Sequence, residues 1–122
     1  MKLGFIGLGR MGENMVLNLA EHKHEIVGYN KSPGPTKKLV RKIKRGFHSS
    51  YSLEEMVYKL SKRGRKVIWL MIPSEAVDPV LEDLTPLLKR GDIVIDGGNS
   101  FFKDSIKRYY EFRKKGIKFI DC

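Results

Sequence analysis

The sequence is poor in cysteine and in long apolar runs. Its one cysteine, Cys122, excludes a disulfide framework within the chain. The longest apolar runs, such as Val67–Ile72, fall far short of the roughly 20 residues that a membrane-spanning helix needs. A glycine-rich segment begins at Gly7, before an apolar stretch of about 7–15 residues can form, so the sequence shows no secretory signal. We therefore expect a cytoplasmic protein without a membrane partner.

Acidic residues are also scarce relative to basic ones. The chain has 24 lysines and arginines against 14 aspartates and glutamates, a formal net charge of +10. Such an excess favours anionic partners, among them phosphates and nucleic acids. It is equally typical of the lysine-rich, solvated surfaces of heat-adapted proteins. Composition alone therefore does not identify a partner.

A chain of 122 residues with 41% hydrophobic residues corresponds to one ordinary domain with a single core. Short apolar runs alternate with amphipathic stretches along it. The runs predict six strands, mostly apolar on both faces, as in a buried parallel sheet. They are Lys2–Ile6, Glu25–Tyr29, a weaker one at Phe47–Ser49, Val67–Ile72, Asp92–Asp96 and Ile117–Asp121.

Between these runs, apolar residues recur three or four positions apart, which predicts helices. Ser52 and Glu55 form a capping signal for one of them. In the last helix the predicted core-facing stripe is Phe102, Ile106, Tyr109 and Tyr110. Strand alternating with helix predicts an α/β fold of the Rossmann type, a doubly wound and mainly parallel sheet with helices on both faces. In such folds ligands bind at the carboxyl ends of the strands.

A G-x-G-x-x-G motif follows the first predicted strand and opens a helix. It consists of Gly7, Leu8, Gly9, Arg10, Met11 and Gly12. The first glycine permits a tight turn, the second lets a pyrophosphate approach the backbone, and the third lets the helix pack closely. The motif therefore predicts dinucleotide binding, with free helix amides facing the phosphates. Arg10 lies either over those phosphates or in solvent.

The residues after the second strand bear on the choice of dinucleotide. Asn30 stands where an NAD site usually has an acid for the ribose 2′-hydroxyl, and Lys31 and Ser32 follow it. Neutral donors and a cation suit a 2′-phosphate, so we expect NADP. The next helix is crowded with cations that either extend this field or form a solvated face. They are Lys37, Lys38, Arg41, Lys42, Lys44 and Arg45.

Two further loops are expected at the same edge of the sheet. Asp96–Ser100 contains two glycines, and its Asn99 and Ser100 either face the nicotinamide end of a cofactor or cap the next helix. Met71, Ile72 and Pro73 either line the cofactor or turn the chain into a helix.

Four segments together resemble the N-terminal coenzyme domain of 6-phosphogluconate dehydrogenase, within the β-hydroxyacid dehydrogenases. They are Gly7–Gly12, Asn30–Ser32, Ser52–Val57 and, most specifically, Ile95–Ser100. The resemblance covers essentially the whole chain. It implies cofactor-binding roles for Gly7, Leu8, Gly9, Arg10, Met11, Gly12, Asn30, Lys31, Ser32, Met71, Ile72, Pro73 and Asn99, with Asn99 also touching substrate.

Two departures from the family pattern bear on the cofactor. Lys31 replaces the arginine that is common in NADP-dependent members, so the planar fork is lost. Met71–Pro73 is similar to a shorter bacterial branch in which NAD is often used. The resemblance thus implies NADP or NADPH as partner, with NAD as the alternative.

The family oxidises 6-phosphogluconate at C3 by hydride transfer and decarboxylates the product to ribulose 5-phosphate, a reaction of the pentose phosphate pathway and of gluconate utilisation. Its lysine base and glutamate acid follow a Ser-Gly-Gly loop that would begin beyond Cys122. We therefore expect residues 1–122 to be a coenzyme domain without catalytic residues. The complete enzyme would add a helical C-terminal domain and form a homo-oligomer, whereas this chain would bind cofactor without turnover.

Other functions are less well supported by the residues. A dehydrogenase of smaller β-hydroxyacids shares the glycine loop but is less expected to have Asp96–Ser100. A non-enzymatic nucleotide- or nucleic-acid-binding module would use the charge, but Tyr109 and Tyr110 fall on the stripe predicted to face the core. His22 and His24 lack a third ligand, so no metal site is expected.

Overall fold

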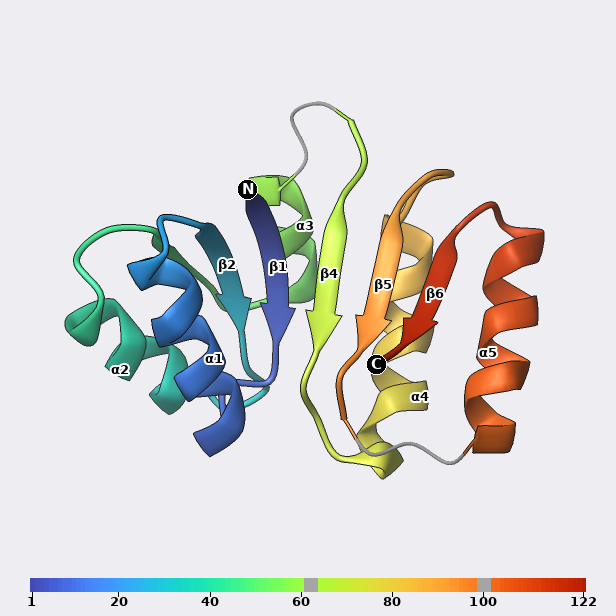
Figure 1. The fold of residues 1–122 in the computed structure, drawn as a ribbon, viewed down its shortest axis with the longest axis horizontal. Helices are drawn as coiled ribbons and strands as arrows, with labels where there is room; N and C mark the ends of the chain where they lie inside the picture. Colours follow the sequence, from blue (N-terminus) through green and yellow to red (C-terminus); the bar gives the residue numbers. More distant parts are fainter. Residues whose placement is uncertain (61–63, 99–101) are drawn as a thin grey trace.

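The computed structural model describes residues 1–60, 64–98 and 102–122, which form a sheet with helices on both faces (Figure 1). Every adjacent strand pair is parallel, and the strand order is β3-β2-β1-β4-β5-β6. The strands are β1 (Lys2–Ile6), β2 (Glu25–Tyr29), β3 (Phe47–Ser50), β4 (Val67–Leu70), β5 (Ile93–Asp96) and β6 (Lys118–Asp121). The predicted doubly wound α/β class is confirmed. The order reverses between β1 and β4, which is where such sheets bind ligands.

The helices divide between the two faces of the sheet (Figure 1). Right-handed crossovers put helices on opposite faces when the chain runs first toward one edge of the sheet and then toward the other. On one face, α1 (Arg10–Glu21) and α2 (Pro33–Lys42) bury Val16 and Leu39 against Phe5. The other face is covered by α3 (Leu53–Leu60), α4 (Ser74–Leu84), a short 3-10 helix (Thr85–Leu87) and α5 (Phe102–Lys114).

The predicted capping signal forms at the start of α3. Ser52 Oγ accepts the N–H of Glu55 at 3.0 Å, and the Glu55 carboxylate accepts the N–H of Tyr51 at 2.6 Å. The carboxylate thus reaches one residue further back than in a standard capping box.

Asp92, predicted within a strand, lies just before β5 and closes the loop that leads into it. Its carboxylate accepts the backbone N–H groups of Lys66 at 2.9 Å and Lys89 at 2.7 Å. Lys66 Nζ also lies 2.9 Å from Asp92 Oδ2, and both side chains are buried. The Asp92 carbonyl accepts the N–H of Lys118, whereas its own N–H donates to the carbonyl of Lys89 in the preceding turn, and β5 begins one residue later than predicted.

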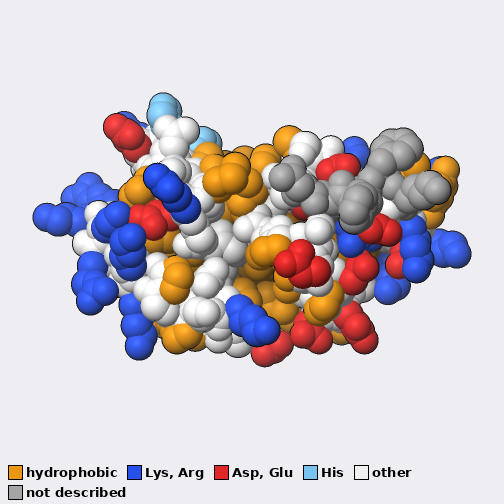
Figure 2. Space-filling model, turned by 90° about the horizontal axis from the view of Figure 1, so that it is seen from below, with side chains coloured by type: hydrophobic (Ala, Val, Ile, Leu, Met, Phe, Trp, Pro, Cys, Tyr) orange, Lys and Arg blue, Asp and Glu red, His pale blue; other side chains and the backbone are white. Residues whose placement is uncertain are grey.

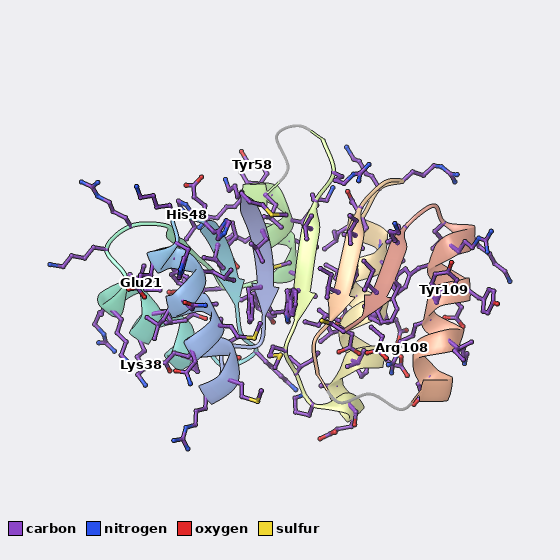
Figure 3. All side chains as sticks on the ribbon, viewed as in Figure 1. Glu21, Lys38, His48, Tyr58, Arg108 and Tyr109 are labelled. Atoms are coloured by element: carbon purple, nitrogen blue, oxygen red, sulfur yellow. The ribbon has the colours of Figure 1, made fainter. Side chains whose placement is uncertain are left out.

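The predicted core-facing stripe of α5 is wrong at Ile106, Tyr109 and Tyr110, which are 41%, 42% and 56% exposed. Arg108 and Phe112 face inward instead, each 5% exposed. Figure 3 shows Tyr109 pointing away from the fold and Arg108 pointing inward. Apolar spacing misjudged this helix because Arg108 is buried with acidic partners, whereas Phe112 stacks on Phe119 at 5.5 Å. The argument against nucleic-acid binding by α5, which assumed that Tyr109 and Tyr110 face the core, is therefore also wrong.

The search for membrane spans and metal clusters covers the described residues. None of the helices there is long and apolar enough to cross a bilayer. No group of three histidine, cysteine or acidic side chains in this part of the chain is arranged to hold a metal ion.

Candidate dinucleotide-binding site

The glycine motif forms the turn between β1 and α1. Gly7 has a φ of +101°, a left-handed conformation that side chains disfavour, and a Cβ there would collide with the carbonyl oxygen of Met71. The Gly7 N–H donates to the carbonyl of Tyr29 at 2.9 Å, which ties the turn to the end of β2. A Cβ at Gly12 would collide with the carbonyl oxygen of Gly7. Packing within the protein therefore requires glycine at positions 7 and 12.

Gly9 differs from its two neighbours in the motif. It is the N-cap of α1, and a Cβ built on it meets no described protein atom within 4 Å. Its backbone is extended, with φ −67° and ψ −170°, which any residue can adopt. Neither packing nor conformation explains the glycine. It leaves open space beside the first amides of a 12-residue helix, where an anion is favoured.

The other residues of the motif face different ways. Leu8 is 1% exposed and packs in the core formed with α1 and α2. Arg10 is exposed, and Met11 is 66% exposed. Of the predicted contacts in this loop, Leu8 can thus offer backbone only, while the side chains of Arg10 and Met11 are free to reach a ligand.

Asn30 connects the glycine motif to the end of β2. Its Oδ1 accepts the backbone N–H of Leu8 at 2.8 Å, and its Nδ2 donates to the carbonyl of Ser32 at 3.0 Å. Lys31 and Ser32 are exposed beside it, and Ser32, the N-cap of α2, makes no side-chain capping hydrogen bond. The sequence predicted all three residues at the site, but not the contact between Asn30 and Leu8.

Glu13 ties α1 to the basic helix α2. Its carboxylate lies 2.7 Å from Lys42 Nζ and 3.3 Å from Lys38 Nζ. The hydrogen bond from Lys42, followed by that from Lys38, holds the pKa of Glu13 below its ordinary value. The pair of lysines thus neutralises the one acid in the first turn of α1.

The segment after β4 lies between the glycine motif and the loop after β5. An added Cβ at Gly7 would lie 2.8 Å from Ile72 Cγ2, and one at Gly98 would lie 2.7 Å from the Ile72 carbonyl oxygen. Met71 and Ile72 are half-buried and Pro73 is exposed at the start of α4. Three loops from β1, β4 and β5 therefore meet at one edge of the sheet, as the topology predicts. Asn99 and Ser100 lie outside the described residues.

Asp96, the last residue of β5, holds the loop that follows it through a hydrogen bond. It is fully buried, and its Oδ1 accepts the N–H of Gly98 at 3.0 Å. Arg108 of α5 lies 3.9 Å from the other carboxylate oxygen and donates to Asp78 of α4 at 2.8 Å. Arg108 was not recognised in the sequence, where a basic residue in a basic helix carries no signal of burial.

Charge is distributed unevenly around this edge. Figure 2 views it end-on: lysine and arginine side chains gather over the half that contains α1 and α2, and acidic side chains gather over the half that contains α4. The acidic residues of α4 include Glu75, Asp78 and Glu82. An elongated anion with one end near α2 would therefore meet a favourable field.

Nearly the whole chain is similar in sequence to known proteins. Residues 2–122 match the family model described as the NAD binding domain of 6-phosphogluconate dehydrogenase. The chain is 40% identical over 120 residues to the decarboxylating 6-phosphogluconate dehydrogenase of Candida albicans, covering 97% of this chain and 23% of that protein. It is 38% identical over 119 residues to the NAD(+)-dependent decarboxylating enzyme of Bacillus subtilis, covering 97% of this chain and 25% of that protein.

A solved structure shows the same fold. The 6-phosphogluconate dehydrogenase of Plasmodium falciparum, described in apo form and in complexes with NADP+ and 6-phosphogluconate, superposes with a TM-score of 0.87 at 28% identity, over 98% of this chain and 26% of that one. The chain thus spans about a quarter of the length of these relatives. The resemblance inferred from the four sequence segments is confirmed: the chain belongs to the family of 6-phosphogluconate dehydrogenase NAD-binding domains.

Proposed function

We propose that this chain binds NADP as the coenzyme domain of a decarboxylating 6-phosphogluconate dehydrogenase. The observation that carries the proposal is Gly9, a glycine that no protein contact requires and that leaves the N-terminus of α1 open. A pyrophosphate at this position would accept hydrogen bonds from the free helix amides. The family match supports a nicotinamide dinucleotide as the ligand.

Each predicted contact has a place along such a ligand. Gly7–Gly12 would hold the pyrophosphate, and the 2′-phosphate would lie near Lys31 and Ser32. Met71–Pro73 would lie beside the stretch toward the nicotinamide. Asn99 is proposed from the sequence alone to touch nicotinamide and substrate. When bound, the dinucleotide would supply the hydride acceptor, and this chain's residues would orient it.

NADP is proposed over NAD because no acid stands at the end of β2. Asn30 is neutral, and Lys31 and the α2 lysines favour an additional phosphate. Relatives support both choices, since the Plasmodium falciparum structure includes NADP+ and the Bacillus subtilis enzyme is named NAD(+)-dependent. The residues of this chain favour the former.

The reaction of the whole enzyme would be oxidation and decarboxylation of 6-phosphogluconate. We propose that residues 1–122 contribute the coenzyme site and that the remaining three-quarters of such an enzyme contribute the catalytic acid and base, a helical domain and the oligomer contacts. The length of the relatives supports this division. The chain alone is then expected to bind cofactor without oxidising 6-phosphogluconate.

Calorimetric titration with NADP and NAD tests the proposal on the chain and two glycine variants. Gly9→Val is expected to lower the affinity for both nucleotides at least a hundredfold, because the side chain would occupy the space proposed for the pyrophosphate. Gly34→Val is the matched control, since a Cβ at Gly34 also meets no described protein atom within 4 Å. It should leave NAD binding unchanged, and urea unfolding should show both variants folded. Equal affinity of Gly9→Val and the unmodified chain would overturn the proposal.

A further inference from the structure

The side-chain amide of Asn30 has a single orientation that satisfies its neighbours. Its oxygen faces a backbone donor, the Leu8 N–H at 2.8 Å, and its nitrogen faces a backbone acceptor, the Ser32 carbonyl at 3.0 Å. Turning the amide over would set donor against donor and acceptor against acceptor. The amide oxygen and one N–H of the amide nitrogen therefore both bond to the protein itself.

These two hydrogen bonds extend a connection that the backbone begins, since the Gly7 N–H already donates to the Tyr29 carbonyl at 2.9 Å where β1 and β2 end. Leu8 belongs to the turn between β1 and α1, whereas Ser32 occupies the N-cap position of α2, and 22 residues separate Leu8 from Asn30. The Leu8 side chain is in the core, so its N–H would be poorly placed to find water if Asn30 were removed. A buried donor that loses its partner costs more than the hydrogen bond itself contributes.

We infer that Asn30 is a positioning residue that fixes the glycine turn and the Lys31–Ser32 turn relative to each other, rather than a ligand of the 2′-phosphate. This inference rests on the dinucleotide-binding function proposed above. The residues at the end of β2 then have two separate roles. Asn30 supports the binding of NAD and NADP alike, and discrimination between them falls to Lys31 and Ser32.

The same geometry explains why an amide rather than an acid occupies position 30. A carboxylate could accept the Leu8 N–H, but it has no proton to donate to the Ser32 carbonyl at neutral pH. It would place a negative charge beside that carbonyl and beside a 2′-phosphate. An alanine would make neither hydrogen bond and add no charge. Comparing Asn30→Ala with Asn30→Asp therefore separates the effect of the lost hydrogen bonds from the effect of an added negative charge.

The test measures NAD and NADP affinity by calorimetry for Asn30→Ala, Asn30→Asp and Lys31→Ala. Asn30→Ala should weaken both nucleotides by a similar factor, about tenfold. Asn30→Asp, which keeps the Leu8 contact, should restore NAD binding to within about threefold of the unmodified chain while NADP stays weak. Lys31→Ala should weaken NADP alone. A loss confined to NADP in Asn30→Ala would overturn the inference, because that pattern marks a 2′-phosphate ligand.

Amide hydrogen exchange at Leu8 in the nucleotide-free chain provides a readout that does not depend on binding. Exchange should be at least tenfold faster in Asn30→Ala and unchanged in Lys31→Ala and Asn30→Asp. Unchanged exchange in Asn30→Ala would overturn the inference whatever the nucleotides do. An unmodified chain that binds neither nucleotide would reject the proposed function, while fast Leu8 exchange in Asn30→Ala would still support the positioning role.

Discussion

The two halves of the sheet are built by the same alternation of strand and helix but use charge differently. Residues 1–50, which form β1, β2 and β3 with α1 and α2, contain ten lysines and arginines and three acids, whereas residues 51–122 contain fourteen and eleven. In the second half, Lys66 is buried with Asp92, and buried Arg108 lies near buried Asp96 and pairs with Asp78, whose side chain is exposed. There, buried cations serve the fold.

In the first half, most cations lie on the surface. Glu13 pairs with Lys38 and Lys42, but Lys31, Lys37 and Arg41 are exposed and have no acidic partner among the residues that the structure describes. Their charge remains available to a ligand at the end of β2. The basic residues behind the net charge of +10 therefore have two different roles. Buried cations in the second half stabilise the domain, and exposed cations in the first half create a positive field that favours an anion.

Removing the buried acid of the second half should have the largest effect on stability. Asp92→Ala leaves the Lys66 ammonium buried without its partner and two backbone N–H groups without an acceptor. We expect a loss of about 3–5 kcal/mol in the free energy of unfolding, a large share of the roughly 5–15 kcal/mol of a typical domain. Urea unfolding at pH 7, followed by the fluorescence of Trp69, measures it.

The control for this substitution removes the buried cation as well. The double variant Lys66→Met, Asp92→Asn should recover part of the lost stability, since no charge is then buried. The folded fraction of each variant should bind NADP as the unmodified chain does. A loss below about 1 kcal/mol for Asp92→Ala would show that the second half does not depend on this pair.

Charge reversal on α2 and on α5 should have different effects on the rate of NADP association. Lys37→Glu with Arg41→Glu on α2, and Arg113→Glu with Lys114→Glu on α5, change the net charge equally, and all four side chains are exposed. We expect the α2 pair to slow NADP association about three- to tenfold at low salt and the α5 pair to change it little. Stopped-flow fluorescence at two ionic strengths measures both. Equal effects from the two pairs would mean that only net charge matters.

The smallest expected effect concerns the contact between α1 and α2. Glu13→Gln removes the carboxylate that pairs with Lys42 and Lys38, and it should cost about 0.2–1 kcal/mol of unfolding free energy at pH 7. Because these lysines hold the folded pKa of Glu13 below its ordinary value of 4.5, the carboxylate stabilises the fold above that pH. The stabilisation is lost as pH falls through the folded pKa.

Urea unfolding of both proteins between pH 7 and pH 3 tests this dependence. The difference between the unmodified chain and Glu13→Gln should shrink steadily on acidification. A difference that stays constant over this range would show that the ion pair does not carry it. Freed Lys38 and Lys42 should also tighten NADP binding slightly at low salt, which sharpens the contrast between the two halves.

Local patterns predicted most of the fold because they report local physics. Short apolar runs predicted the six described strands, and apolar spacing of three or four residues predicted the five described α-helices, although not the short 3-10 helix Thr85–Leu87. The glycine motif predicted a turn that the structure shows with a positive φ at Gly7. Errors occurred where a distant partner overrides spacing. In α5 the inward position is taken by Arg108, whose acidic partners come from α4 and β5.

The sequence by itself determined the alternation of strands and helices and the glycine turn after β1, because spacing and turn chemistry act within a few positions along the chain. Only the tertiary structure decided that a Cβ added at Gly9 would meet no described protein atom, whereas one added at Gly7 or Gly12 would collide with a backbone carbonyl. It also decided that the Asn30 amide bonds to the backbone of Leu8 through its oxygen and to the backbone of Ser32 through its nitrogen. The physical reason is that these properties depend on atoms brought together from separate strands, and a linear pattern does not record such distances.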